Sequence, residues 1–440
     1  MIKIYWFLLN QFGDLQLFIL SLFILLYSEQ MAYQGFSDFQ NQLLVLSNLQ
    51  ILLVDVIDSE YIVSETKKQG LFSKFTEIEI ESNFLIYESF LQLLSRVSLL
   101  RPSNQKCIEI IKEILKELNL NHDLKSSFCE TTIFCIFKKN KNLVLFLYEE
   151  GIIGFDIIKN EIIHSQKRDY MSFFLPEMQK YDPQLNRRYI HMFQLQGEMF
   201  NNEDDLNKFI LSRSKGHSPE KIASIIRDDD LDAFISYETQ RDNFKINEQI
   251  NDNLIESNED INNFSNGVSL IEYSMIFGSL NIFKYLWVKK AKIKSTSPKY
   301  SIIGRNYEII QILEEESSMN FDINCLSKSI EYLYQDITDY LLGNHNFELT
   351  ESLLYKISIP SIDFVNLYKI LKDPSPTLEN SNNEYFSGDL LKHDYNKEVF
   401  TEYISKNPME YYIYVNFVVQ QQFIDINAKC ELVFFIIYSF

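Results

Sequence analysis

The stretch VSLIEYSMIFGSLNIFKYLW (residues 268–287) predicts two short helices joined by a tight turn. Ser269 is expected to cap the first helix, because its hydroxyl accepts a hydrogen bond from a backbone N–H that the first turn leaves unpaired. Gly278 supplies the left-handed backbone conformation that ends a helix and reverses the chain. Ile282, Phe283 and Leu286 fall on one face of the second helix. Repeated helix pairs of this kind build scaffolds for contacts rather than catalytic pockets.

Weaker copies of this unit surround it. The hexamer NIFKYL, which ends at Leu286, resembles hexamers further along the chain, and from Leu286 onward they end about every 28 residues. The related hexamers are NLVLFL ending at Leu147, DLDAFI at Ile235, EIIQIL at Leu313, DITDYL at Leu341 and NLYKIL at Leu371. The longer interval before Leu286 contains residues 239–267, which are rich in Asn, Asp and Glu. We predict that this acidic insert is an exposed loop between repeats.

A second sequence motif recurs in register with these hexamers. The segments NFKIN (243–247), NFDIN (320–324), NFELT (346–350) and FIDIN (423–427) resemble one another, and their terminal Asn or Thr is expected to cap a helix. In a stacked array these segments lie at the loop tips, where partners are contacted. The polar tip residues that we select as candidate protein-binding residues are Asn247, Asp322, Asn324 and Glu348.

These units resemble ankyrin repeats. That pattern opens with Thr-Pro-Leu-His and continues to an Ala, a Gly and a second helix. Ser269 stands at the Thr position, Ser274 at the Ala position and Gly278 at the Gly position. In an earlier unit Ser218 and Pro219 match Thr-Pro, Ala223 matches the Ala, and Arg227 replaces the Gly. From about Met31 the chain is similar to protist ankyrin-type proteins, which join a helical N-terminal region and a domain of unknown function to divergent repeats.

The resemblance implies an all-α fold, with a helical N-terminal region followed by an irregular ankyrin-like helix-pair solenoid. It also implies a non-enzymatic role in protein–protein interaction. Bulky Ile, Phe and Tyr stand where ankyrin helices have small residues, so an irregular curvature is expected. The organisation that we predict is an apolar segment at 1–30, a helical N-terminal domain at 31–159, an irregular linker at 160–217, and degenerate repeats at 218–440 with the acidic insert at 239–267.

The prediction of a helical N-terminal domain rests on the spacing of its apolar residues. Apolar residues recur at helical spacing over 41–57, 84–99, 105–118 and 142–150. Residues 160–217 show little periodicity and contain Pro176 and Pro183, which indicates an irregular connection with short helices.

The first thirty residues allow three interpretations. Two apolar runs are interrupted by residues 10–14, and a spanning helix needs about 20 apolar residues, so neither run spans a membrane alone. In the first interpretation, Met31 is the biological start and the preceding residues are an upstream artefact. In the second, the segment is a signal or membrane anchor. In the third, it is a packed helix. The first, which we favour, makes the protein cytoplasmic; the second makes it membrane-associated or secreted. The apolar residues 431–440 are too short to span.

Composition and motifs exclude several function classes. The net charge is −20, and nucleic-acid binding needs Lys/Arg patches, so we expect no nucleic-acid partner. No phosphate-binding glycine loop, no H-E-x-x-H motif and no complete nucleophile elbow occurs. The spacing of His122, Cys129 and Cys135 fits no zinc module. We therefore expect no catalysis, no cofactor and no metal. The expected partner is an unidentified, basic protein that binds less well at high salt.

Overall fold

The computed structural model describes residues 28–104, 106–165, 168–192, 203–251, 253–262, 267–316, 319–347 and 349–372. These residues are mostly helical, which confirms the predicted all-α class. The chain divides into two units, one of residues 1–47 with 364–440 and one of residues 48–363. Of the expected features, residues 1–27, Glu348 and everything after residue 372, including the segment 423–427, lie outside the described residues.

Helices form where the N-terminal periodicity predicts them. Helix α3 (Ser28–Asp58) covers the first apolar run, and its residues up to 47 belong to the smaller unit. In the larger unit, Asn83 caps α5 by accepting a hydrogen bond from the Ile86 N–H, and Asn140 caps α9 in the same way. The other described elements of this region are α4 (Tyr61–Glu77), η1 (Ile80–Ser82), α5 (Phe84–Val97), α6 (Cys107–Asn121), α7 (Leu124–Ser127), α8 (Glu130–Phe137) and α9 (Lys141–Glu149).

Residues 160–217 contain more regular structure than an irregular linker. The described parts form α10 (Phe155–Ser165), α11 (Arg168–Phe173), α12 (Leu175–Tyr181), α13 (Pro183–Met192) and α14 (Glu203–Lys215). Pro176 and Pro183 stand in the first turns of α12 and α13, where a missing N–H breaks no helical hydrogen bond. Phe173, Phe174 and Met178 are buried, so this stretch contributes side chains to a packed core. The helices are too short to show clear periodicity in the sequence.

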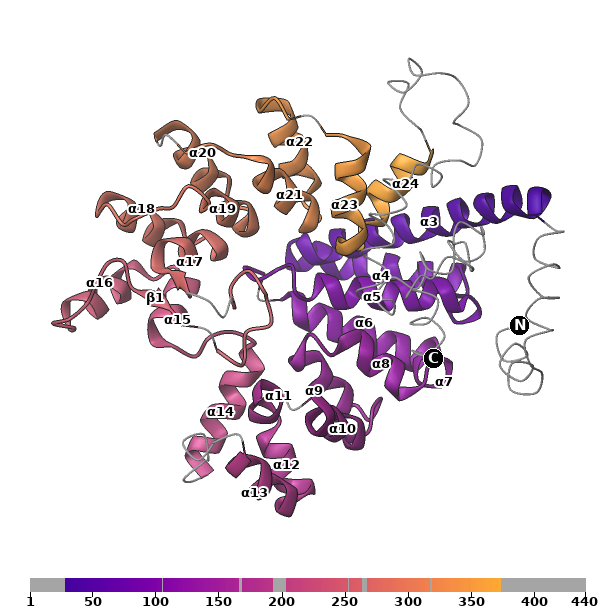
Figure 1. Ribbon diagram of the computed structural model, residues 1–440, viewed down its shortest axis with the longest axis horizontal. Coiled ribbons are helices and arrows are strands. Elements are labelled where there is room, and N and C mark those ends of the chain that lie inside the picture. Colours follow the sequence, from indigo (N-terminus) through magenta and orange to yellow (C-terminus); the bar gives the residue numbers. More distant parts are fainter. Residues whose placement is uncertain are drawn as a thin grey trace, which may run out of the picture. The chain divides into compact units, whose positions relative to one another are not determined.

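Helix pairs follow one another from residue 221 onward (Figure 1). Helices α15, α17, α19, α21 and α23 each contact the next in this order, and α16, α18 and α20 do the same. The pairs are α15 (Lys221–Arg227) with α16 (Leu231–Thr239), α17 (Leu270–Phe277) with α18 (Leu280–Val288), α19 (Pro298–Gly304) with α20 (Tyr307–Glu316), and α21 (Ile323–Glu331) with α22 (Gln335–Asn344). Then come α23 (Glu351–Ser361) and, in the smaller unit, α24 (Phe364–Lys372).

The pair at 268–287 has the predicted caps. Ser269 accepts a hydrogen bond from the Glu272 N–H, and the Glu272 carboxylate accepts one from the Ser269 N–H, which completes a capping box. Gly278 ends α17 in the left-handed conformation, with φ 66°. Ile282, Phe283 and Leu286 are fully buried. The local predictions for this stretch are therefore confirmed.

A left-handed residue recurs where each first helix ends. Asp229, Gly278, Arg305, Leu333 and Ile362 all have positive φ and follow α15, α17, α19, α21 and α23 in turn. For the four that are not glycine, this conformation costs roughly 1–2 kcal/mol each. Their recurrence indicates that packing between successive pairs imposes the same turn at each position.

One glycine sets the approach of α19 to α17. A Cβ at Gly304 would lie 1.9 Å from the backbone oxygen of Met275 and 3.0 Å from that of Ile276. Only a residue without a side chain allows the two backbones to lie this close. The packing of α17–α18 against α19–α20 therefore depends on two glycines, Gly278 at the turn after α17 and Gly304 at the contact between α17 and α19.

The acidic insert is partly buried, which corrects the expectation of an exposed loop. Strands β1 (Gln249–Ile250) and β2 (Val268–Ser269) pair antiparallel and close its base. Within it Ile255, Glu256, Asn258 and Ile261 are buried. Hydrogen bonds from its own asparagines satisfy much of the loop's backbone, so burial does not leave those groups unpaired.

Ionic and aromatic contacts join the N-terminal helices to the helix pairs within the larger unit. Arg101 is buried, its Nε lies 3.0 Å from Asp58 Oδ1, and its Nη1 donates to the backbone oxygen of Tyr332. The guanidinium groups of Arg101 and Arg305 lie 4.3 and 4.8 Å from the ring centroid of Tyr334. Arg305 also pairs with Asp58. Both guanidinium groups thus contact the Tyr334 ring and both pair with the Asp58 carboxylate. These contacts hold the N-terminal helices against the helix pairs.

One described stretch, Asp38–Asp58 of α3, is long and apolar enough to cross a membrane. Length and composition alone give this result, and a buried core helix passes the same test. Leu49, Leu53 and Val56 of this stretch are fully buried in the structure.

Candidate functional site

A polar cavity of about 300 Å³ is the candidate site. Its walls come from the end of α5, the start of α6, the N-terminus of α9, the end of α14, helix α15 and the insert loop. Most of the residues that line it are charged, hydroxyl-bearing or amide-bearing. Ligand sites are concave, and convergent polar groups within them fix the orientation of a bound molecule.

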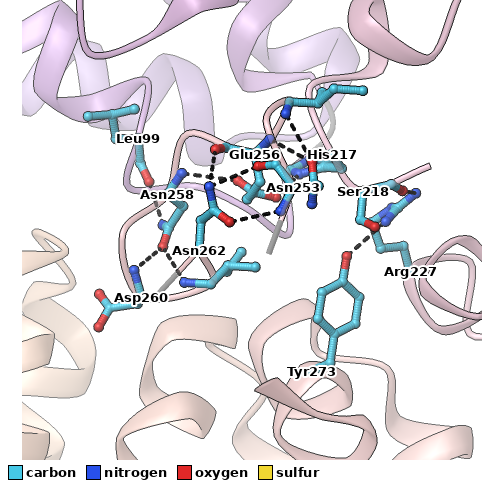
Figure 2. A network of polar contacts seen from close by, with 12 residues as sticks. Leu99, His217, Ser218, Arg227, Asn253, Glu256, Asn258, Asp260, Asn262 and Tyr273 are labelled. Atoms are coloured by element: carbon cyan, nitrogen blue, oxygen red, sulfur yellow. Dashed lines mark hydrogen bonds and ion pairs between the residues drawn. The ribbon is translucent and has the colours of Figure 1, made fainter. Parts of the chain in front are cut away.

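The insert loop 253–262 forms one wall and holds its own shape. Asn253 Oδ1 accepts hydrogen bonds from the N–H groups of Ile255 and Glu256. Asn262 accepts from the Asn253 N–H and donates to the backbone oxygens of Asn253 and Glu256 (Figure 2). Asparagine side chains mimic backbone turns in this way. The loop therefore presents Glu256 and its neighbours from a fixed backbone.

Asn258 anchors the loop to two other parts of the unit. Its Nδ2 donates to the Leu99 backbone oxygen at 2.6 Å and to the Tyr332 hydroxyl at 3.0 Å. The Tyr332 hydroxyl lies 2.8 Å from Asp260 Oδ2, which also accepts from Lys328 Nζ. Burial raises the pKa of Tyr332 well above its usual value, so the hydroxyl keeps its proton and donates to Asp260.

Charged side chains converge at the α14–α15 side of the cavity. His217 Nδ1 lies 2.8 Å from Glu256 Oε2, and the buried Glu256 uses its other oxygen to accept from the Asn258 N–H. Arg227 donates to the Tyr273 hydroxyl at 2.8 Å and to the Ser218 backbone oxygen at 3.0 Å (Figure 2). Burial raises the pKa of Tyr273, so it stays neutral. Among the described residues, Arg227 therefore has neutral hydrogen-bond partners and no carboxylate within ion-pair distance.

Ser257 and Gly216 also line the cavity. The Ser257 Oγ is buried and has no hydrogen-bond partner among the described residues. A Cβ at Gly216 would lie 3.0 Å from Asn142 Nδ2, so this glycine leaves room for the amide. Buried hydroxyl groups without partners are uncommon in folded proteins, because each one forgoes the hydrogen bonds it makes in water.

The structure gives the predicted tip residues mainly local hydrogen bonds. Asp322, rather than Asn324, caps α21 by accepting from the N–H groups of Asn324 and Cys325. The Asn324 amide donates back to Asp322, so these two lie together. Asn247 lies in a turn before β1 and accepts a hydrogen bond from the Lys292 N–H. Glu348 is outside the described residues.

The sequence interpretation missed the cavity residues His217, Arg227, Glu256, Ser257 and Asn258. The available signal was the presence of Leu254, Ile255 and Ile261 in an otherwise polar loop, since apolar residues at such positions indicate an anchored loop. In the sequence, Arg227 is distinguished only by its place at a glycine position of the repeat.

Within the part of the chain that the structure describes, no group of three or more His, Cys, Asp or Glu is placed to hold a metal ion. Comparison with protein-family models, with curated proteins and with solved structures finds no match for this chain.

Proposed function

We propose that this protein is a non-enzymatic interaction scaffold built on ankyrin-like repeats. The observation that carries the proposal is the stacking order, in which each first helix from α15 to α23 contacts the next first helix, and the second helices α16, α18 and α20 do the same. A solenoid packs in this way, since each repeat buries its apolar face only against its neighbours. The resulting extended surface suits contacts with another protein.

The recurring turn supports the same proposal. The left-handed residues Gly278, Arg305, Leu333 and Ile362 recur about every 28 residues, the interval of the hexamers in the sequence. Side chains that cap helices also form hydrogen bonds between successive pairs. Asp229, which follows α15, accepts hydrogen bonds from the N–H groups of Asn281 and Ile282 at the start of α18. Asn306 caps α20 and donates to the Gly278 backbone oxygen.

The proposed partner is a basic protein. The second helices carry exposed carboxylates, namely Asp232 on α16, Glu308, Glu315 and Glu316 on α20, and Asp336 and Asp339 on α22. The lysines at 289, 290, 292 and 294 form a separate basic loop after α18. Complementary charge raises the association rate and fixes orientation, and salt weakens both effects. The candidate contacts thus include these carboxylates together with the loop tips at Asn247, Asp322 and Asn324.

Charge reversal tests the proposal. The full chain, a Glu315→Lys/Glu316→Lys variant and a Glu203→Lys/Asp204→Lys control would be used to capture partners at low and high salt. Each captured protein would then be titrated against all three chains. Both variants change the net charge equally, but the control pair lies on α14.

We expect a saturable partner whose dissociation constant rises about tenfold in the α20 variant and stays unchanged in the control. High salt should weaken binding to the unmodified chain. A chain that captures no saturable partner at low salt contradicts the proposal. So does an equal loss of affinity in both variants, because that result reports net charge rather than the repeat surface.

A further inference from the structure

We propose that the basic loop between α18 and α19, residues 289–294, is a docking site for an acidic segment of another protein. Its lysines, at positions 289, 290, 292 and 294, are all exposed. The site goes beyond the proposed scaffold function, because that proposal assigns a basic partner to carboxylates on the second helices. The basic loop would bind a segment of the opposite charge through different residues.

The distribution of charge along the chain is the first observation. Residues 273–307 contain six lysines, one arginine and no Asp or Glu, although the whole chain has a net charge of −20. Within this stretch Lys284 and Arg305 pair with carboxylates of other elements. The lysines of the basic loop are therefore the main source of uncompensated positive charge in this stretch.

The lysines of the basic loop are available to a partner. Lys290 and Lys292 have no carboxylate within ion-pair distance among the described residues. The other two lysines lie 3.9 Å from Glu238 and Glu272, and their side chains are 50% and 61% exposed. Exposed pairs of this kind contribute little to stability, so an incoming carboxylate can replace them.

Hydrogen bonds fix the backbone of the basic loop while its lysine side chains extend into solvent. The Ala291 N–H donates to the last turn of α18 at 3.0 Å, and the Lys292 N–H donates to Asn247 Oδ1 at 2.8 Å. The Lys294 N–H donates to Ser297 Oγ at 3.0 Å. A backbone that is already ordered loses less conformational freedom when a partner binds.

Acidic neighbours limit the shape of the partner. Helix α18 lies between α16 and α20 in the stack. On the α20 side, Trp287 Nε1 donates to Glu316, which follows the exposed Glu315. On the α16 side, the turn before β1 carries the exposed Asp242. A bilayer or a DNA duplex presents a broad negative surface, which these carboxylates would repel. An extended acidic peptide is narrow enough to contact the lysines between them.

The test uses the full chain and a fluorescent peptide of alternating Glu and Gly, with a Gln–Gly peptide of the same length as the uncharged control. At about 0.1 M salt the Debye length is about 10 Å, so distant carboxylates of the chain are screened while contacts at the lysines persist. We expect saturable binding of the Glu–Gly peptide alone, and its loss at about 1 M salt. Absence of saturable binding at millimolar peptide, or equal binding of both peptides, overturns the proposal.

Charge reversal identifies the site. Lys290→Glu/Lys292→Glu should raise the dissociation constant of the Glu–Gly peptide about tenfold or more, because repulsion replaces attraction at two positions. Lys180→Glu/Lys208→Glu is the matched control. It changes the net charge equally at exposed lysines of α12 and α14, and it should bind as the unmodified chain does. Equal affinities of the two variants would overturn the assignment of the site.

Two further measurements use the unmodified chain, so they do not depend on how a variant folds. A carbodiimide that joins carboxylates to nearby amines should link the bound peptide mainly to the lysines of the basic loop, and links mainly to other lysines would overturn the site. Phosphatidylserine vesicles and duplex DNA should compete poorly with the peptide. Tighter binding of either one at the same lysines would overturn the choice of an acidic protein segment.

Discussion

Replacing Gly304 with alanine tests the contact between α17 and α19 directly. The added Cβ would lie 1.9 Å from the Met275 backbone oxygen, whereas real Cβ contacts are essentially never closer than 3.0 Å. The nearest atoms belong to the backbone, so no side-chain rotation relieves the clash. One helix must therefore move by roughly 1 Å or more, in a core that packs as densely as an organic crystal.

The magnitude follows from two opposing effects. Overpacking a well-packed core costs about 1–3 kcal/mol, and a clash with backbone lies at the upper end of that range. Alanine regains up to about 1 kcal/mol over glycine in a helix. The net loss in the free energy of unfolding should therefore be about 2 kcal/mol. Gly70→Ala is the matched control, because Gly70 lies inside α4 with no atom within 4 Å of its added Cβ. It should gain up to about 1 kcal/mol.

Urea unfolding followed by circular dichroism measures both variants, and amide hydrogen exchange shows where protection is lost. Gly304→Ala should unfold at lower urea and expose amides of α17 and α19 first. If Gly304→Ala is as stable as the unmodified chain, or gains stability as Gly70→Ala does, the close approach of the two helices is refuted.

Three other perturbations follow from the same structure. Ser269→Ala removes the capping box and should lower the unfolding free energy by about 1 kcal/mol, whereas Ser269→Thr should restore most of it; equal midpoints for the two variants would contradict the cap. Arg101→Met removes one of the two arginines beside Asp58 and leaves the Tyr332 backbone oxygen without its donor, so it should cost about 1–3 kcal/mol in urea unfolding, and an unchanged midpoint would contradict the buried pair. Burial raises the pKa of Glu88 to about 7 from its ordinary 4.5, so the folded state binds the proton more tightly, and stability should fall as pH rises between these two values. Glu88→Gln should therefore stabilise the protein by about 3 kcal/mol above pH 7 relative to pH 4, and an equal effect at both pH values in urea titrations would contradict this burial.

Local chemistry explains which parts of the fold were predictable. The cap at Ser269, the turn at Gly278 and the buried face of α18 depend on neighbouring residues, so the sequence predicted each of them. Helices α5 and α6 were predictable because their apolar residues recur over several turns, and α9 was predictable because residues 143–147 form one continuous apolar run. The short helices α11–α13 were not, since six to ten residues give too few turns for a periodic pattern.

The candidate cavity was beyond sequence reasoning. Asn258 lies in a polar segment typical of exposed loops, yet its amide binds Leu99, which is 159 residues away. Arg227 donates to the Tyr273 hydroxyl and to the Ser218 backbone oxygen, and only the fold decides which groups approach it. Ser257 is one of many serines until burial removes its solvent partners.

The sequence by itself determined the all-α class, the positions of the main N-terminal helices and the cap and turn of the unit at 268–287, because hydrogen bonds and side-chain periodicity within a few residues set these features. Only the tertiary structure decided that α19 approaches α17 at Gly304 and that the acidic insert is buried against Leu99 and Tyr332. These features depend on groups far apart in the chain. Their energies come from close packing and from satisfying buried polar groups, which exist only once the helices have come together.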